Sequence, residues 1–433
     1  MAAIFIEHKS MIKTMIKAIM QNEQRKFILI FLFITFFVTQ QVNAQSIWTA
    51  GMKRPDGNTI VFNFQLATLQ HKTVLYLLNG SDKFLVDSVQ FRNDSVFIQM
   101  PVFESQFKAK VLAPDLWQGV WKKGTSAIPV ELPFTATVQP DKFQQTSPAS
   151  ANLSGRWQVT FTRPNGTLRP AIAEFKQTGN IITGTFLTPS GDYRYLSGIV
   201  TGDTLKLSTF DGGHAYLFHA IAENDSILKN GFFYSDATAT EKFSAVKNRN
   251  AQLPDSIAAT YMKPGETTLH FTFPDLNHHP VSLQDAAFKN KVVVLQIMGS
   301  WCPNCMDETQ FLSKFYDAYK DKGVAVIALA YELSTDFNRS KASLEKFQHR
   351  FNVQYPILIT GAAVNDSLKT EKTLPALQSI KVFPTLIFIG KDGKVAKIDT
   401  GFYGPGSGEY YKKFQEDFEH TIQYLLQQNS TTE

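Results

Sequence analysis

Cys302 and Cys305 are the only cysteines of the 433-residue chain, and two residues separate them. A disulfide between them closes a very small loop, so it constrains the unfolded chain little. Proteins of oxidising compartments use cysteines mainly as structural crosslinks, a purpose that a single close pair serves poorly. The pair therefore indicates reversible thiol–disulfide chemistry, with a purely structural surface disulfide as the alternative.

A Cys-x-x-Cys pair could also supply half of a zinc site. Structural zinc needs four ligands, and the chain has no second cysteine pair. Its histidine clusters, His278 with His279 and His214 with His219, lie on other segments. We therefore expect no metal and no bound cofactor, and the redox group is the dithiol itself.

The cysteine pair lies between an expected strand and an expected helix. Val292–Met298 is a continuous apolar run, which is typical of a buried parallel strand, and residues 306–320 have apolar side chains at helical spacing. A sulfur at a helix N-terminus meets unpaired N–H groups and the positive end of the helix dipole, which favour the thiolate. We therefore expect Cys302 to be the exposed nucleophile and Cys305, one turn deeper, to be the buried resolving thiol.

Strands and helices alternate through the rest of the C-terminal third. The remaining expected elements are a strand at Val324–Ala330, a helix at 340–351, a strand at 355–359, a hairpin of 384–389 and 395–398, and a closing helix at 408–426. This order predicts an α/β sheet with helices on both faces.

Two further motifs accompany the cysteines: Glu308, and Val382-Phe383-Pro384-Thr385 further along the chain. Together with Trp301-Cys302-Pro303-Asn304-Cys305, they make residues 266–429 resemble the thioredoxin superfamily, and specifically the TlpA/ResA-like exported thiol–disulfide oxidoreductases. The resemblance implies that Pro384 is a cis proline facing the cysteines. It also implies that the active site is flanked by Trp301, Pro303, Asn304 and Phe383.

The resemblance places Glu308 near the cysteines, where it helps to set their proton affinity; a solvated surface glutamate is the alternative. Gln310 stands where the family often has a proline, and Gln296 stands where general thioredoxins have a buried aspartate. Because an amide does not titrate, proton handling would depend on Glu308 or on water.

Two other features near the expected sheet edge are interpreted as ordinary loop residues. Glu332 follows the second strand, at an edge where α/β sheets hold their sites, and we expect it to be an exposed loop glutamate. Gly404-Pro405-Gly406-Ser407-Gly408 is expected to be a loop and helix cap, because no lysine follows it at the spacing of a phosphate-binding loop.

Residues before the C-terminal third have the alternating pattern of β-strands separated by Asp-Gly and Asn-Gly turns. Several residues recur at an offset of 109. They are Trp48, Arg54, Pro55, Gly57, Asp94, Phe134 and Ala136, matched by Trp157, Arg163, Pro164, Gly166, Asp203, Phe243 and Ala245. The fold class predicted is two duplicated all-β modules, 46–140 and 152–248, followed by an α/β thioredoxin-like domain at 266–429.

The N-terminus is typical of an export signal at residues 1–44. Arg25-Lys26 precedes the mostly apolar residues 27–38, and Val42-Asn43-Ala44 suits signal peptidase. The apolar run would rise about 18 Å as a helix, short of the roughly 30 Å hydrocarbon core. We expect cleavage after Ala44 and a periplasmic or other extracytoplasmic location, with membrane association through an uncleaved segment as the alternative; Met20 is an alternative start.

Charge gives no reason to expect a nucleic-acid partner. The net charge is +5, of which residues 1–44 carry +3. About +2 remains for the rest of the chain, which is too little to indicate binding to nucleic acid or an anionic membrane.

The expected function is reduction of disulfide-bearing protein substrates, with electrons supplied by a membrane thiol donor. A thiol peroxidase is one alternative, but Gly299-Ser300-Trp301 stands where peroxiredoxins have Thr or Ser and a proline. A ligand- or partner-binding protein with a redox effector domain is the other. The β modules offer no convergent polar set for that role, and Trp48 and Trp157 are expected in their cores.

Overall fold

The computed structural model describes residues 46–124, 129–254 and 259–428. The expected signal segment, 1–44, lies outside the described residues. Within the described part of the chain, no helix combines the length and apolar character that a membrane crossing requires. The described residues from Ile47 onward form one compact unit.

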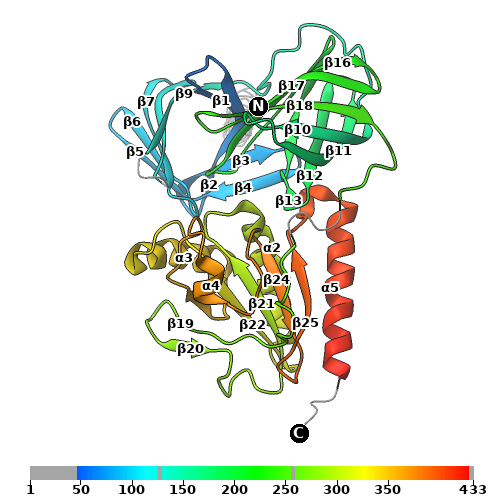
Figure 1. Ribbon diagram of the computed structural model, residues 1–433. Coiled ribbons are helices and arrows are strands. Elements are labelled where there is room, and N and C mark those ends of the chain that lie inside the picture. The colour runs from blue at the N-terminus through cyan, green and yellow to red at the C-terminus, as the bar shows by residue number, and fades with distance from the viewer. Residues whose placement is uncertain (1–45, 125–128, 255–258, 429–433) are drawn as a thin grey trace, which may run out of the picture. The chain divides into compact units, whose positions relative to one another are not determined.

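Nine antiparallel strands, β1 to β9, make up the first sheet (Figure 1). Their bounds are β1 Ile47–Lys53, β2 Thr59–Leu69, β3 Lys72–Asn79, β4 Asp82–Val86, β5 Ser88–Arg92, β6 Ser95–Gln99, β7 Ser105–Ala113, β8 Leu116–Lys123 and β9 Val130–Val138. The order across the sheet is β4-β3-β2-β1-β9-β8-β7-β6-β5. Side chains alternate between buried and exposed along strands such as β7, which is the pattern of a sheet with one solvated face.

A second sheet contains β10 to β18. Their bounds are β10 Gly155–Thr162, β11 Leu168–Thr178, β12 Ile181–Thr188, β13 Gly191–Asp192, β14 Leu196–Thr201, β15 Thr204–Phe210, β16 Ala215–Asn224, β17 Ile227–Ser235 and β18 Ala239–Lys247. The order is β11-β10-β18-β17-β16-β15-β14-β12-β13, and β12 also pairs with β11. This second pairing closes the sheet into a barrel.

The two sheets share registers at the recurring residues. Trp48 opposes Phe64 and Val138, and Trp157 opposes Ala173 and Lys247, each partner displaced by the same 109 positions. Both tryptophans are buried core residues, as expected. The sheets differ at one place. In the second sheet β12 pairs with β14, whereas among the described residues the corresponding strands of the first sheet, β3 and β5, do not pair.

A five-stranded sheet forms the core of the C-terminal third, in the order β23-β22-β21-β24-β25. The strands are β21 Val292–Met298, β22 Val324–Ala330, β23 Ile357–Ile359, β24 Thr385–Ile389 and β25 Val395–Thr400. The first three run parallel, and β24 and β25 are antiparallel to their neighbours. This is the predicted α/β arrangement, and the predicted bounds of β21 and β22 coincide with the observed ones.

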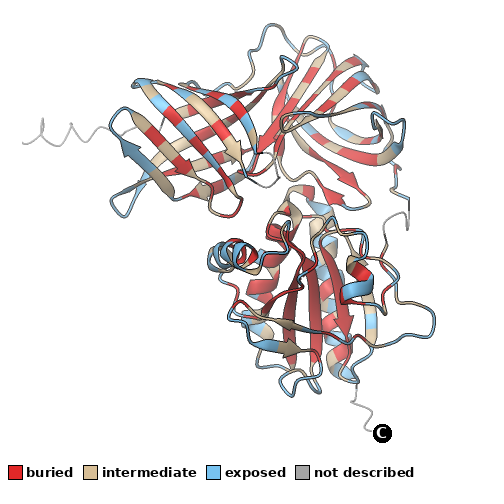
Figure 2. Cartoon of the chain, turned by 60° about the vertical axis from the view of Figure 1, so that its left-hand side comes forward, coloured by how far each residue is buried: buried red, intermediate tan, exposed pale blue. Residues whose placement is uncertain are grey.

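Helices cover both faces of this sheet. The helices are α2 Pro303–Tyr319, α3 Phe337–Phe351, α4 Lys369–Thr373 and α5 Glu409–Gln427, with a 3-10 turn η1 at Pro405–Ser407. Apolar side chains of α2, α3 and α5 share a core with one face of β21, and Leu374, which follows α4, packs on the other. The strands β21 to β24 are buried along their length, whereas the edge strand β25 is only partly buried (Figure 2). The helix after β21 begins at Pro303, directly after Cys302, as predicted. The short helix α4 and the two short strands β19 Thr272–Pro274 and β20 Pro280–Ser282 were not predicted.

Candidate active site

The cysteine pair lies where β21 ends and α2 begins. Cys302 is the N-cap residue of α2, with extended backbone angles, and Pro303 occupies the first turn, where its missing N–H costs nothing. Cys302 and Cys305 are joined by a disulfide, with their Cα atoms 5.2 Å apart. The Cys305 backbone N–H donates to the Cys302 Sγ at 3.2 Å. Such a donor stabilises negative charge on that sulfur once the disulfide is reduced.

The expected exposure of Cys302 is wrong for the oxidised chain. Its relative exposure is 3%, and that of Cys305 is 0%. The physical reason is long-range packing on the turn between the cysteines. The Asn304 Nδ2 donates to the backbone oxygens of Asp192 and Phe402, each at 3.3 Å. Residues from the second sheet therefore lie directly against the cysteine motif.

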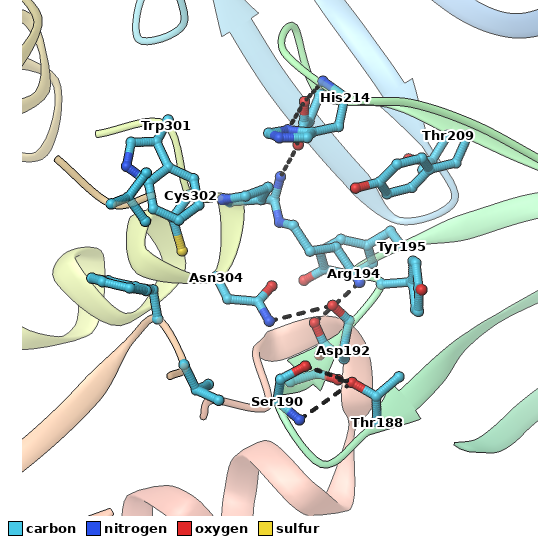
Figure 3. Close-up of a pocket in the computed structure, with 18 of the residues that line it drawn as sticks. Thr188, Ser190, Asp192, Arg194, Tyr195, Thr209, His214, Trp301, Cys302 and Asn304 are labelled. Atoms are coloured by element: carbon cyan, nitrogen blue, oxygen red, sulfur yellow. Dashed lines mark hydrogen bonds and ion pairs between the residues drawn. The ribbon is translucent and has the colours of Figure 1, made fainter. Parts of the chain in front are cut away.

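A cavity of about 460 Å³ remains beside the disulfide (Figure 3). Its walls come from three regions of the chain, and Asn79 and Asp82 are the contribution of the first sheet. The C-terminal third contributes Trp301, Cys302, Pro303, Asn304, Lys381, Val382 and Phe383, and the second sheet contributes Asp192, Tyr193, Arg194, Tyr195, Asp211, His214 and Tyr216. A substrate that reaches Cys302 through this cavity therefore meets side chains of the β-sheets as well as those of the C-terminal third.

The peptide bond between Phe383 and Pro384 is cis. Phe383 lines the same cavity as Cys302, and its ring lies 5.5 Å from the Trp301 ring in an edge-on arrangement. Trp301 is held in turn by its Nε1–H, which donates to the Tyr331 backbone oxygen at 2.9 Å. The structure thus brings the cysteine motif and the residue before Pro384 together.

Glu308 is buried, with a relative exposure of 1%, so the surface alternative is wrong. The Gln296 Nε2 donates to the Glu308 Oε2 at 2.8 Å. The Gln296 Oε1 accepts a hydrogen bond from the Thr309 hydroxyl. Burial raises the pKa of the Glu308 carboxyl to about 8, although the hydrogen bond from Gln296 opposes this. Glu308 therefore keeps its proton at neutral pH, and its role toward the cysteines stays a prediction.

Glu332 was expected to be an exposed loop residue, and this is also wrong. It is 6% exposed and accepts hydrogen bonds from the Ser300 backbone N–H at 2.8 Å and the Ser300 hydroxyl at 2.7 Å. The cause is the parallel pairing of β21 and β22, which brings the residues that follow both strands to one sheet edge. Burial raises the pKa of Glu332 to about 7.

A buried charge cluster beside the cavity had no signal in the sequence. The Arg194 guanidinium donates to both carboxylate oxygens of Asp307, at 2.8 and 2.9 Å. Asp211 lies 4.0 Å from Arg194 and also pairs with His214. Burial and the nearby Asp307 raise the pKa of Asp192 to about 7. For Asp211, burial opposes ionisation, but His214 and Arg194 hold its pKa at about 2.

The described residues contain no group of three or more His, Cys, Asp and Glu side chains arranged to hold a metal ion.

Comparison with known proteins gives the same assignment for the C-terminal third. The Redoxin family model matches residues 263–410. The thiol-disulfide oxidoreductase ResA of Geobacillus kaustophilus (strain HTA426) is 31% identical over 142 residues, which are 33% of this chain and 72% of that protein. ResA of Bacillus thuringiensis subsp. konkukian (strain 97-27) is 31% identical over 134 residues, 31% of this chain and 68% of that protein.

Solved structures give matches of similar extent. A thiol-disulfide oxidoreductase from Bacteroides fragilis NCTC 9343 aligns with 35% of this chain and 99% of its own, at 16% identity and a TM-score of 0.28. A thioredoxin-family thiol:disulfide interchange protein from Chlorobium tepidum TLS aligns with 38% of this chain and 99% of its own, at 15% identity and a TM-score of 0.28. From the family match and the ResA relatives, the chain belongs to the ResA-like thiol–disulfide oxidoreductases of the thioredoxin superfamily, with Cys302 and Cys305 as its cysteine pair.

Proposed function

We propose that this oxidoreductase is an exported reductase of disulfide-bearing proteins. The observation that carries the proposal is the position of Cys302 at the N-cap of α2, with the Cys305 N–H directed at its sulfur, beside a cavity that also contains Phe383. A helix N-terminus stabilises a thiolate, and a thiolate is the species that attacks a disulfide.

The proposed reaction has two exchange steps. The Cys302 thiolate attacks one sulfur of the substrate disulfide, forms a mixed disulfide and releases the other substrate sulfur as a thiolate. Deprotonated Cys305 then attacks the Cys302 sulfur, restores the Cys302–Cys305 disulfide and releases the second substrate sulfur. Two electrons pass from the enzyme to the substrate, and each released thiolate takes up a proton.

The oxidised enzyme must be reduced again by an external dithiol. We propose a membrane thiol carrier as this donor, and no cofactor besides the cysteine pair. In the regeneration step a donor thiolate attacks the Cys302–Cys305 disulfide, and the donor leaves as a disulfide.

The direction of exchange is tested by redox titration of the purified chain against glutathione. We expect a reduction potential more negative than roughly −230 mV, and a value near −120 mV would instead indicate an oxidase. Insulin reduction driven by dithiothreitol, compared with peroxide turnover under the same conditions, distinguishes the reductase from a thiol peroxidase. Peroxide turnover without insulin reduction would refute the proposal.

Export is a separate part of the proposal and depends on the N-terminal sequence. The run at 27–38 and Val42-Asn43-Ala44 predict a mature protein that begins at Gln45. N-terminal sequencing of the exported form tests this prediction. A membrane-bound product that still carries residues 25–44 would show an anchor in place of a cleaved signal.

We also propose that the two β regions arose by duplication of one module. The shared offset of 109 in the registers of β1 and β10 supports this, as do nine strands in each sheet. In this proposal the copies diverged after the duplication, so that β12 and β14 pair in one sheet while β3 and β5 of the described residues do not pair in the other.

A further inference from the structure

Residues 188–195, here called the cover segment, belong to the second sheet but pack on the cysteine motif. Gly191 makes an isolated bridge with Phe402, and the Tyr403 hydroxyl donates to the Thr188 backbone oxygen at 2.9 Å. The Gly404 backbone N–H donates to the Asp192 carboxylate at 2.9 Å. These contacts join the cover segment to the loop that precedes α5.

Glycines on both sides make this close approach possible. A Cβ on Gly191, whose φ is +138°, would overlap the Asn304 Nδ2 and lie 2.8 Å from the Phe402 oxygen. A Cβ on Gly401 would lie 3.0 Å from Ser190, and one on Gly406 would lie 3.0 Å from Arg194. The glycine-rich stretch before α5, which was expected to be a loop and helix cap, thus also accommodates the cover segment.

A buried ion pair fixes the cover segment to the active-site helix. Arg194 binds Asp307 of α2 through two hydrogen bonds, and the two side chains are 11% and 8% exposed. Asp192 and Asp211 also lie near Arg194. Removing one partner of a buried pair leaves the other as an uncompensated charge. Arg194 is therefore the cation on which this contact depends.

We infer that the cover segment determines substrate specificity: it limits Cys302 to disulfides on extended chain segments and excludes those on folded protein surfaces. This inference rests on the proposed function. Cys302 is almost fully buried, and the adjoining cavity has the size of a site for a small ligand or short peptide. The cavity is lined by Phe383 from the C-terminal third and by His214 and Tyr216 from the second sheet, so an extended segment that enters it contacts both regions. A rigid globular surface does not reach the Cys302 sulfur as long as the Arg194–Asp307 ion pair keeps the cover segment in place.

The test compares two substrates that carry the same disulfide-bonded sequence, one as a free peptide and one as a surface loop of a folded protein. For the native chain, we expect kcat/KM to favour the peptide by at least about tenfold. In Gly191→Ala and Arg194→Gln, which displace the cover segment, we expect this preference to fall by about tenfold. Equal kcat/KM for the two substrates with the native chain would overturn the inference without any variant.

Matched controls separate displacement of the cover segment from general damage to the second sheet. Gly166→Ala alters another positive-φ glycine, where an added Cβ meets no atom of the described residues, and Arg163→Gln removes an arginine that is 52% exposed. Both should keep the native preference. If all four variants behave alike while circular dichroism shows them folded, the cover segment does not set specificity.

Alkylation of the reduced chain distinguishes failure of this inference from failure of the proposed function. The rate at which a bulky maleimide labels Cys302, divided by the rate for iodoacetamide, needs no reductase activity. We expect this ratio to rise about tenfold in Gly191→Ala and Arg194→Gln and to stay at the native value in the controls. A raised ratio in these two variants without reduction of either substrate would refute the proposed reductase function but not the role of the cover segment. An unchanged ratio would refute only the role of the cover segment.

Discussion

We expect Cys302→Ser to reduce disulfide reduction to the background rate and Cys305→Ser to retain substrates on the enzyme as covalent adducts. The two sulfurs differ in position although they are three residues apart. Cys302 is the N-cap of α2 and accepts the Cys305 N–H, so its thiolate is stabilised. Cys305 lies inside the first turn, is fully buried, and does not line the cavity. Attack therefore begins at Cys302, and release depends on Cys305.

Non-reducing gels of each variant, purified from the cells that express it, measure this difference. We expect Cys305→Ser to show adduct bands that collapse with dithiothreitol, and mass spectrometry of those bands identifies the substrates. Cys302→Ser, and the double variant as a matched control, should show none. Adducts on Cys302→Ser instead would reverse the assignment of the nucleophile and contradict the argument from the helix N-terminus.

Local patterns were sufficient to predict the elements that hold the cysteines. Val292–Met298 and Val324–Ala330 were predicted with their observed bounds because each is a continuous apolar run, buried on both faces of the sheet. The N-terminus of α2 was predicted at Cys302, with Cys305 one turn deeper, and this is where the helix begins. Apolar periodicity alone would have placed the start later, because it begins only at Met306 and the first turn from Pro303 lacks it.

Burial of the site residues could not be predicted, because it arises from contacts between distant parts of the chain. Arg194 and Asp307 are 113 positions apart, and nothing in the sequence around either residue indicates the other. The prediction that Glu332 is exposed used only its position in the loop after a strand. Its burial follows instead from the pairing of β21 with β22. The sequence drew attention to both Gln296 and Glu308, but the hydrogen bond between them appears only when α2 packs on β21.

Glu308→Gln should remove a large loss of stability between pH 5 and pH 8. The pKa of Glu308 is raised from 4.5 to about 8 by burial. Between these values the unfolded chain has released the proton and the folded chain retains it, so unfolding releases a proton and the free energy of unfolding falls as pH rises. The stabilising contribution is full below pH 4.5 and is lost as pH passes 8. From pH 5 to pH 8 the expected loss is about 4 kcal/mol, an order-of-magnitude value.

Urea unfolding of the oxidised chain at pH 5 and pH 8 measures this loss, and the comparison with Glu308→Gln cancels the other groups that titrate. Glu345→Gln, which alters an exposed glutamate of α3, is the matched control and should keep the native pH dependence. The same ionisation should oppose formation of the Cys302 thiolate, because like charges disfavour each other in a buried site. The pH profile of Cys302 alkylation in the reduced native chain should therefore have an inflection near pH 8 that Glu308→Gln lacks. Superimposable profiles would limit Glu308 to a structural role, since only coupling between the carboxyl and the thiol makes them differ.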